Sequence, residues 1–256
     1  MQSIATSSYH ALEFEAIRRF RNGLSFNANY TWAHSLDDVS DALGVLTNDS
    51  ANLLNAAKPL SFNRGNSQFD IRNRFVLSYN YEIPFTSHFH GALKYLLDGW
   101  SQSGIFSAQS GLPATVYAAP IFGITDTLVN GTSSPASGTV TTTLNGDATK
   151  LHPVPNLNSP AAQANTPVSE PLLGNDGTCG RNHLRLAGLT DFDVAFSKLF
   201  KFTESKRFQL RWEMFNVLNH PNFSGYNNNF ASGAFNTYNS TATNMRQMQV
   251  SAKFIF

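Results

Sequence analysis

Apolar and polar residues alternate with a period of two in seven separate segments of the chain. Between residues 24 and 33, Leu, Phe, Ala, Tyr and Trp at the even positions alternate with Ser, Asn, Asn, Thr and Ala at the odd positions. This is the period of a β-strand with one apolar face, not the 3.6-residue period of a helix. The pattern predicts strands at residues 11–20, 24–33, 74–83, 100–109, 191–197, 208–214 and 247–256. We therefore expect an all-β, antiparallel fold.

The connections between these segments alternate in length. Residues 21–23 and 201–206 are short enough for tight turns, and the first of them contains Asn-Gly, a typical hairpin pair. Residues 35–73, 111–190 and 218–245 are long enough for large loops. Strands of about ten residues with short turns at one end and long loops at the other are typical of an outer-membrane β-barrel. The pattern thus predicts about seven long transmembrane strands with long extracellular loops.

The longest loop, residues 112–189, differs in composition from the strands. It is rich in Pro, Thr and Asn, and eight of the 11 prolines lie between residues 111 and 178. A loop of this length without its own secondary structure is uncommon in a compact soluble domain. We interpret it as an extracellular loop within a single barrel domain that covers residues 1–256.

Charge and aromatic content narrow the classes of protein further. Only 14% of the residues are charged and the net charge is +1, which excludes a basic platform for nucleic acid. Aromatic residues make up 12% of the chain, and no run of 18 apolar residues predicts a transmembrane helix. The apolar rows end in aromatic residues, where interfacial girdles lie in membrane barrels. The residues at these ends are Phe20, Trp32, Tyr81, Trp100, Phe200 and Phe256.

Two other folds share the alternating pattern and stay open as alternatives. A small autonomous outer-membrane barrel, acting as a pore or an adhesin, has the same strands. A soluble β-sandwich that binds sugars also alternates apolar and polar residues, because one face of each sheet packs in the core. The predicted strands are longer than the usual strands of soluble sheets, which favours the membrane barrel.

Several short motifs, in order along the chain, resemble the barrel of TonB-dependent outer-membrane transporters. The nearest subgroup is the Oar-like one of Gram-negative bacteria, whose members often carry a carboxypeptidase-regulatory-like domain. The motifs are YHALEF (9–14), RRFRNGLSF (18–26), YTWAHSLDD (30–38), FDIRNRF (69–75), GW (99–100), QSG (109–111), GRN (180–182), FDV (192–194) and FNVLNHPNF (215–223). Together they cover nearly the whole chain except residues 112–178.

The resemblance implies a protein of the cell outer membrane that takes up a bulky nutrient. Members of the family close 22 strands around an N-terminal plug and contact TonB near their N-terminus. Residues 1–256 carry no such parts, and seven is an odd number of strands, so we expect the C-terminal portion of a larger barrel with more strands before Met1. The expected partners are outer-membrane lipid, the barrel assembly machinery and, through the N-terminal parts, the TonB system. The substrate is not identified.

Six residues stand out as candidates for a functional role. Arg74, Glu82, Arg211 and Glu213 belong to the polar rows, which face the lumen of a barrel. The apolar pair Phe254 and Phe256 resembles the C-terminal signal that the outer-membrane assembly machinery reads. We expect no catalytic residue, no cofactor and no metal site, and therefore no enzyme.

Asp37, Asp38 and Cys179 carry weaker hypotheses. Asp37 and Asp38 follow a predicted strand, and together with Asp41 and Asp49 they could supply oxygen ligands to a hard cation, but the spacing of the four matches no calcium loop. We expect them in a solvated loop. Cys179 lies between glycine-rich turns without a flanking base motif, which predicts an incidental loop thiol.

Overall fold

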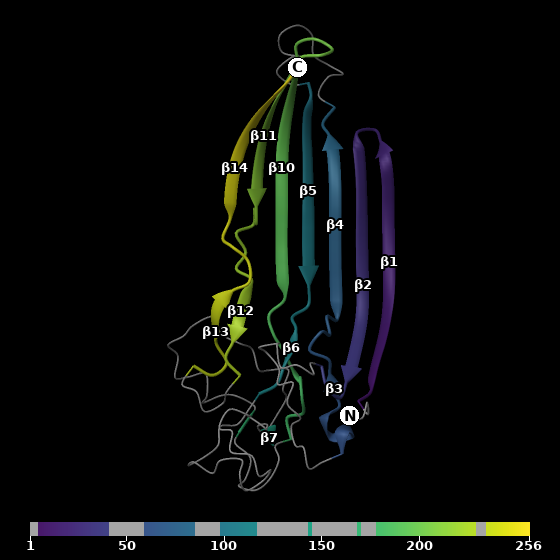
Figure 1. Ribbon diagram of the computed structural model, residues 1–256, viewed down its shortest axis with the longest axis vertical. Coiled ribbons are helices and arrows are strands. Elements are labelled where there is room, and N and C mark those ends of the chain that lie inside the picture. The colour runs from purple at the N-terminus through teal and green to yellow at the C-terminus, as the bar shows by residue number, and fades with distance from the viewer. Residues whose placement is uncertain are drawn as a thin grey trace.

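One long antiparallel sheet dominates the protein (Figure 1). The computed structural model describes residues 5–40, 59–84, 98–116, 143–144, 168–169, 178–228 and 234–256. Its seven long strands follow the order β1-β2-β4-β5-β10-β11-β14, and the short β3 pairs with β2. The long strands are β1 Ser7–Arg21, β2 Leu24–Asp37, β4 Asn73–Glu82, β5 Trp100–Gln109, β10 Leu189–Lys201, β11 Arg207–Phe215 and β14 Gln247–Ile255.

The shorter elements all lie at the end of the sheet where the long loops emerge (Figure 1). Three separate two-stranded sheets form there, from β6 with β9, β7 with β8 and β12 with β13. The bounds of these elements are η1 Leu60–Asn63, β3 Gly65–Asn66, β6 Pro113–Ala114, β7 Thr143–Leu144, β8 Val168–Ser169, β9 Leu184–Arg185, β12 Phe223–Tyr226 and β13 Tyr238–Thr241.

The seven predicted strands are all present, and the first hairpin has the predicted turn. Asn22 and Gly23 between β1 and β2 have positive φ angles of 54° and 80°, as a tight hairpin with the right-handed strand twist requires. A Cβ atom on Gly23 would lie 2.6 Å from the carbonyl oxygen of Glu82, so this position also lacks room for a side chain. Several strands extend further than predicted. β1 begins at Ser7, and β2 continues to Asp37.

The pairing register places the apolar rows of all seven strands on one side of the sheet, which we call the apolar face. Tyr30 lies opposite Phe14 on one neighbouring strand and Phe75 on the other, and Phe106 lies opposite Leu77 and Phe192. Side chains alternate between the faces of a strand, so a single register aligns every row. The other side, the polar face, consequently carries mostly Ser, Asn, Thr, Gln and charged residues.

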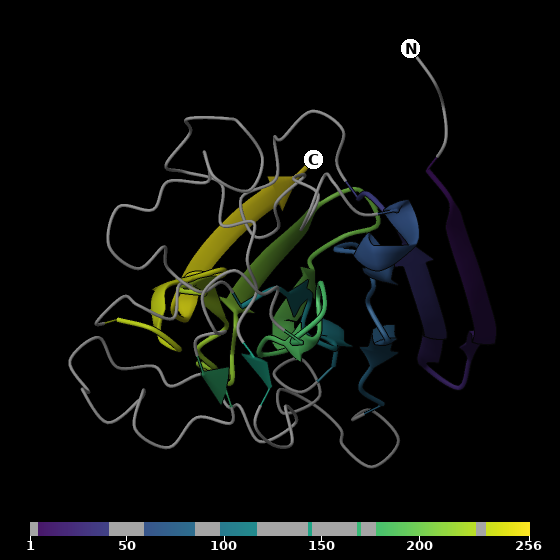
Figure 2. The same ribbon diagram turned by 90° about the horizontal axis from the view of Figure 1, so that it is seen from below.

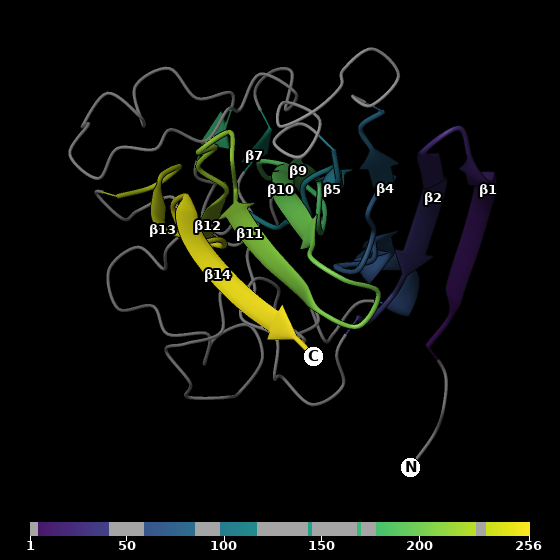
Figure 3. The same ribbon diagram turned by 90° about the horizontal axis from the view of Figure 1, so that it is seen from above.

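No second layer of described residues covers the apolar face. Large side chains on it are exposed, among them Phe14 at 58%, Trp212 at 45% and Val250 at 75%. A soluble sheet would bury such a face against another sheet or a helix. No helix in the described ranges is long and apolar enough to cross a bilayer. The views along the strands show one curved sheet, with β1 and β14 as its two separated edges (Figures 2 and 3).

The described buried residues gather mainly at the loop end. There the connections after β2, β5 and β11 pack together into what we call the loop cap, described at residues 38–40, 59–72, 110–116, 178–188, 216–228 and 234–246. The cap has its own apolar core, formed by Ala114, Val116, Cys179, Leu184, Tyr226, Phe235 and Tyr238. Phe235 is completely buried, and the hydroxyl of Tyr238 accepts a hydrogen bond from the backbone of Ala187 at 2.6 Å. The loops thus form a folded structure above the sheet.

Candidate functional site: the polar face and its mouth

The polar face is the first part of the candidate site. On β5 it carries mainly small polar residues, whereas on β4, β10, β11 and β14 it carries charges as well. The four charged residues predicted to face a lumen, Arg74, Glu82, Arg211 and Glu213, all lie on this face. The register supports the prediction that this face borders a lumen, which stays a prediction.

Arg211 and Glu213 are brought together with a third residue, Gln249. The guanidinium Nε of Arg211 donates a hydrogen bond to Glu213 Oε1 at 2.7 Å, and the amide of Gln249 donates to Glu213 Oε2. Gln249 lies directly opposite Glu213 across the β11–β14 pair. Both oxygens of the carboxylate are therefore occupied. The three side chains form a polar network on an exposed wall, which fixes the direction of the arginine.

Arg74 and Glu82 are not brought together. They lie at opposite ends of β4, with Arg74 opposite Thr31 and Gln109 near the loop cap and Glu82 opposite Ser101 near the short turns. Both residues are exposed, and neither forms an ion pair with another described residue. They offer charges to the space in front of the polar face and do not form one site.

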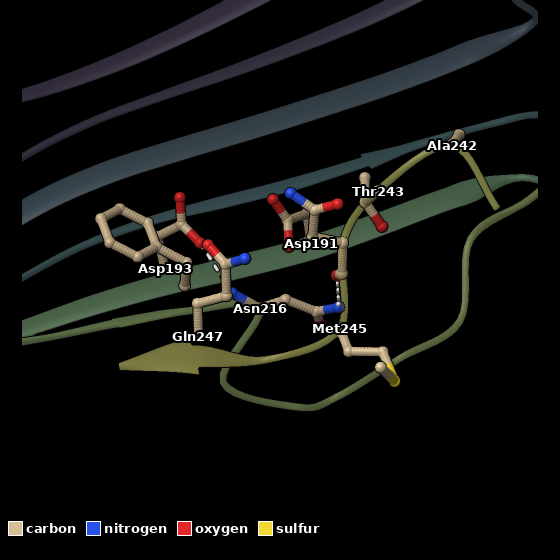
Figure 4. Close-up of a pocket in the computed structure, with 9 residues that line it drawn as sticks. Asp191, Asp193, Asn216, Ala242, Thr243, Met245 and Gln247 are labelled. Carbon is tan, nitrogen blue, oxygen red and sulfur yellow. Dashed lines mark hydrogen bonds between the residues drawn. The ribbon is translucent and has the colours of Figure 1, made fainter. Parts of the chain in front are cut away.

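A pocket of about 360 Å³ lies where the polar face meets the loop cap (Figure 4). Two aspartates of β10 form one wall, and the ends of the connection between β11 and β14 form the other. The lining residues are Asp191, Asp193, Phe215, Asn216, Ala242, Thr243, Asn244, Met245 and Gln247. No Lys, Arg or His is among these lining residues, so the pocket presents mainly oxygen acceptors and amides.

Asn216 holds the two walls of this pocket together. Its backbone N–H donates to Asp193 Oδ1 at 2.9 Å, and its side-chain amide donates to the carbonyl oxygen of Asn244 at 3.1 Å (Figure 4). The same amide also donates to the carbonyl oxygen of His220 at 3.1 Å. Its positive φ of 48° turns the chain sharply as β11 ends. In contrast, Oδ1 of Asp191 is buried and has no hydrogen-bond partner among the described residues. A ligand with a hydroxyl or N–H group would satisfy this oxygen.

Asp37 and Asp38 are buried in the loop cap, so the expectation of a solvated loop was wrong. Asp37 is 6% exposed and pairs with Arg181, whose guanidinium also donates to the carbonyl oxygen of Asn63 at 2.8 Å. Asp38 is 5% exposed, accepts hydrogen bonds from Thr6 and pairs with Arg64 at 3.3 Å. The reason is pairing with arginines that are distant in the sequence, which removes both carboxylates from water; Arg181 belongs to another loop, and Arg64 to a later part of the same loop. Asp41 and Asp49 lie outside the described residues.

Asp70 ties a further pair of loops to the end of the sheet. It accepts a hydrogen bond from the backbone of Ser35 at 2.6 Å and forms ion pairs with Arg185 and Arg72. Burial raises the pKa of the Asp70 carboxyl, but the hydrogen bonds and the positive charges together outweigh burial and hold this pKa below its ordinary value. The carboxylate is therefore charged at neutral pH and fixes the cap.

The structure shows where Cys179 and the two C-terminal phenylalanines lie. Cys179, predicted to be an incidental loop thiol, lies in a loop of the cap, where it is 3% exposed and belongs to the apolar core. Phe254 projects from the apolar face opposite Phe208, and its ring centroid lies 6.1 Å from that of Phe256. Both phenylalanines are exposed, at 52% and 91%. Their role as an assembly signal stays a prediction.

The pocket at the mouth was not predicted. Asp191 and Asp193 were visible as polar positions of a strand, because their two-residue spacing puts them on one face. Asn216 and Thr243 belong to the connection between β11 and β14, which has no periodicity, and no local signal shows that it returns to β10. Only the pairing of β10 with β11 and of β11 with β14 brings these residues together.

Comparison with known proteins assigns the fold to a family. Residues 1–249 match the family model described as an outer membrane beta barrel domain. Neither a search of curated proteins nor a search of solved structures found a match. The family match agrees with the antiparallel sheet, the uncovered apolar face and the long loops at one end. The chain thus belongs to the outer membrane beta barrel domain family and is located in the cell outer membrane.

Proposed function

We propose that this chain forms part of the wall of a TonB-dependent transporter that takes up a bulky polar nutrient. The observation that carries the proposal is the shape of the polar face. Seven long strands curve through only part of a circle (Figures 2 and 3). The register gathers their polar side chains on one face, which in this proposal is the inner side. Narrow barrels of about eight strands fill their lumen with side chains, whereas wide ones leave room for a channel or a plug.

Each part of the candidate site has a role in this proposal. The loop cap and the pocket with Asp191 and Asp193 meet the nutrient first, because they lie at the end with long loops. The Arg211–Glu213–Gln249 network and the separate charges of Arg74 and Glu82 then line its path. The chain binds and passes a solute and catalyses no covalent reaction.

The expected partners follow from the same scheme. The assembly machinery of the outer membrane reads the end of β14 with Phe254 and Phe256. Energy for transport comes from TonB, which contacts an N-terminal part of the transporter. A soluble sugar-binding sandwich has less support, because the apolar face is uncovered over seven strands and the chain belongs to an outer-membrane barrel family. A small autonomous pore or adhesin shares both observations, and the dependence of uptake on TonB separates a pore from the transporter.

Growth and uptake experiments in the bacterium that carries the gene test this proposal. The gene and tonB are deleted separately, and each strain grows on a panel in which oligosaccharides, peptides or chelated iron are the only source of carbon, nitrogen or iron. We expect both deletions to abolish uptake of the same radiolabelled nutrient, and a plasmid copy to restore uptake in the first strain. Uptake that persists without TonB would identify a passive pore and contradict the proposal.

A variant separates a role in transport from a role in folding. Replacing the charges of the polar network, as in Arg211→Gln with Glu213→Gln, leaves hydrogen-bonding side chains of similar size. We expect normal amounts in the outer membrane and slower uptake of the nutrient. The matched control replaces the lipid-side residue Leu210 with Met, which changes the opposite face of the same strand and should leave uptake unchanged.

A further inference from the structure

Basic residues that form no ion pair with a described carboxylate gather at the end of the sheet that carries the short turns. We call this group the basic rim, and it consists of Arg18, Arg19, Arg21, Lys201, Lys206, Arg207 and Lys253. The acidic residues described near the same end are Glu82, Asp98 and Glu204. This part of the protein therefore has an excess of positive charge, although the net charge of the whole chain is only +1.

The charges of the basic rim are not neutralised within the described part of the chain. All seven side chains are exposed, and none forms an ion pair with a described carboxylate. Arg18 donates to the backbone carbonyl of Arg21 at 3.3 Å, and Arg207 donates to that of Glu204 at 3.2 Å. At the loop end, by contrast, Arg64, Arg72, Arg181 and Arg185 all pair with aspartates. The two ends of the sheet therefore differ in the charge that they present.

The aromatic residues of the apolar face show where the rim lies relative to the membrane. Phe200, Phe208 and Phe254 are direct register partners across β10, β11 and β14, and they form a row on the apolar face. Such rows mark the boundary between hydrocarbon and headgroups. Lys201 and Arg207 occupy the next register position beyond this row. They consequently lie at the level of the lipid phosphates.

The position of Lys198 is independent evidence for where the membrane boundary lies on the sheet. It belongs to the apolar face, but its ammonium group reaches the backbone carbonyl of Asp98 and lies 4.9 Å from the ring centroid of Phe200 and 5.9 Å from that of Trp100. A lysine on a lipid-facing surface directs its charge toward the interface in this way. The hydrocarbon boundary therefore passes close to Lys198, immediately next to the basic rim.

We propose that the basic rim binds the anionic headgroups of phospholipids in the periplasmic leaflet of the outer membrane. Short turns of such barrels face the periplasm, whose leaflet contains phospholipids. Lys and Arg clusters at the headgroup level attract anionic lipids. The binding fixes the depth and orientation of the sheet in the bilayer. This inference depends on the outer-membrane location and not on the proposed transport function.

Tryptophan quenching by lipids tests the proposal directly. The three tryptophans, Trp32, Trp100 and Trp212, all lie on the apolar face. The full chain is extracted from outer membranes and reconstituted in phosphatidylcholine vesicles that contain brominated phosphatidylglycerol or, separately, brominated phosphatidylcholine. We expect phosphatidylglycerol to associate about threefold more strongly at low salt, because the rim adds electrostatic attraction. Equal association of the two lipids would overturn the proposal.

Variants and salt separate the rim from the rest of the protein. Replacing Lys201, Lys206 and Arg207 together with Gln should remove most of the preference. The single variants Arg207→Gln and Arg246→Gln are a matched pair, since each arginine is exposed and donates to a backbone carbonyl, but Arg246 lies at the loop end. Only Arg207→Gln should weaken the preference. A preference that is unchanged in the triple variant would overturn the assignment to the rim.

Salt and phosphate keep the test valid even if the triple variant does not fold. With the unaltered protein, about 0.5 M NaCl should abolish the preference, because charges are screened within a few ångströms at that concentration. A preference that resists this salt would contradict an electrostatic rim. Inorganic phosphate at about 10 mM should act no differently from chloride at equal ionic strength. A specific loss in phosphate would identify a site for the free anion and overturn the lipid assignment.

Discussion

The phenol ring of Tyr79 occupies the space that a side chain on Gly104 would take. The two residues are register partners on β4 and β5, and a Cβ atom on Gly104 would lie 2.7 Å from Cε1 and 2.8 Å from Oη of Tyr79. The glycine therefore lets the aromatic ring lie flat across the neighbouring strand, on the apolar face. This arrangement fills the gap that a glycine leaves in a sheet.

Gly104→Ala should therefore destabilise the sheet. The added methyl group forces the Tyr79 ring to move, and overpacking of this kind lowers the free energy of unfolding by about 1 to 3 kcal/mol. Urea unfolding of the reconstituted protein, followed by tryptophan fluorescence, measures the change. In a Tyr79→Leu background, which removes the ring atoms that collide, the same substitution should be nearly neutral. An equal loss in both backgrounds would show that the ring is not the cause.

The buried pair of Arg181 and Asp37 predicts a second large effect. The Arg181 side chain is 2% exposed and the Asp37 side chain 8%, and the arginine also donates to the carbonyl oxygen of Asp37 at 2.5 Å. Removing one partner of such a pair leaves a buried charge, which lowers the free energy of unfolding by about 3 to 5 kcal/mol. We expect Arg181→Ala to make the loop cap sensitive to protease.

A conservative variant and a distant control make this second prediction specific. Arg181→Lys keeps the charge but loses the fork of donors that also reaches Ser40, so the cap should be intermediate in protease sensitivity. Arg246→Gln removes an exposed arginine of the same cap and should have no effect on cleavage. Cleavage of Arg181→Ala at the rate of the unaltered protein would contradict the structural role of the pair.

Truncation of Phe235 tests whether the loop cap has a core of its own. The ring is completely buried among Val116, Leu184 and the two tyrosines of the cluster. Phe235→Ala should lower the free energy of unfolding of the cap by about 3 to 5 kcal/mol, because it removes a large side chain and leaves a cavity. Hydrogen exchange should then accelerate in the cap and stay unchanged in β4 and β5. Exchange that accelerates equally in all strands would show that cap and sheet unfold as one unit.

The strands could be predicted from the sequence, whereas the cap could not. Each strand carries its own signal, since residues such as Phe75, Leu77 and Tyr79 recur at every second position and a single register aligns them. The position of Arg74, Arg211 and Glu213 on the polar face follows from the same period. Predicted ends of β1 and β2 were less accurate at the loop end, where β1 begins at Ser7 and β2 continues to Asp37, because the alternation of apolar and polar residues fades there.

The loop cap depends on contacts between residues that are far apart in the chain. Asp37 meets Arg181 across 144 positions, and Asp70 meets Arg185 across 115. Neither aspartate is distinguished locally from a solvated loop residue, because the arginine that neutralises it belongs to another connection. For the same reason the pocket at Asp191 could not be predicted from the sequence, because its opposite wall comes from the connection between β11 and β14.

Acid should loosen the cap within a defined pH range. Hydrogen bonds from Thr6 hold the pKa of Asp38 below its ordinary value of 3.8, and the pKa of Asp70 is lowered too, because the hydrogen bonds and charges of Arg185 and its neighbours outweigh burial. A carboxyl with a lowered folded-state pKa stabilises the fold above its ordinary pKa, and this stability is lost as the pH falls through the lowered value.

Hydrogen exchange should therefore be constant from neutral pH to about pH 4, after correction for the intrinsic rate, and accelerate in the cap below it. Faster exchange in the cap between pH 5 and 7 would contradict the assignment of the transition to Asp38 and Asp70. The variant Asp70→Asn should weaken the cap at neutral pH and make it less sensitive to acid.

Chemical labelling of two neighbouring residues can distinguish the environments of the two faces of the sheet. Leu77 and Ser78 follow each other on β4 and project from the apolar and the polar face respectively. The chain contains a single cysteine, Cys179, so Cys179→Ala gives a background without thiols. In cells, a membrane-impermeant maleimide should react with the variant S78C if the polar face lines an aqueous lumen, whereas L77C should react only with a lipid-soluble maleimide. The opposite result would place lipid against the polar face, and equal reaction of both variants with the water-soluble reagent would show that neither face contacts the bilayer.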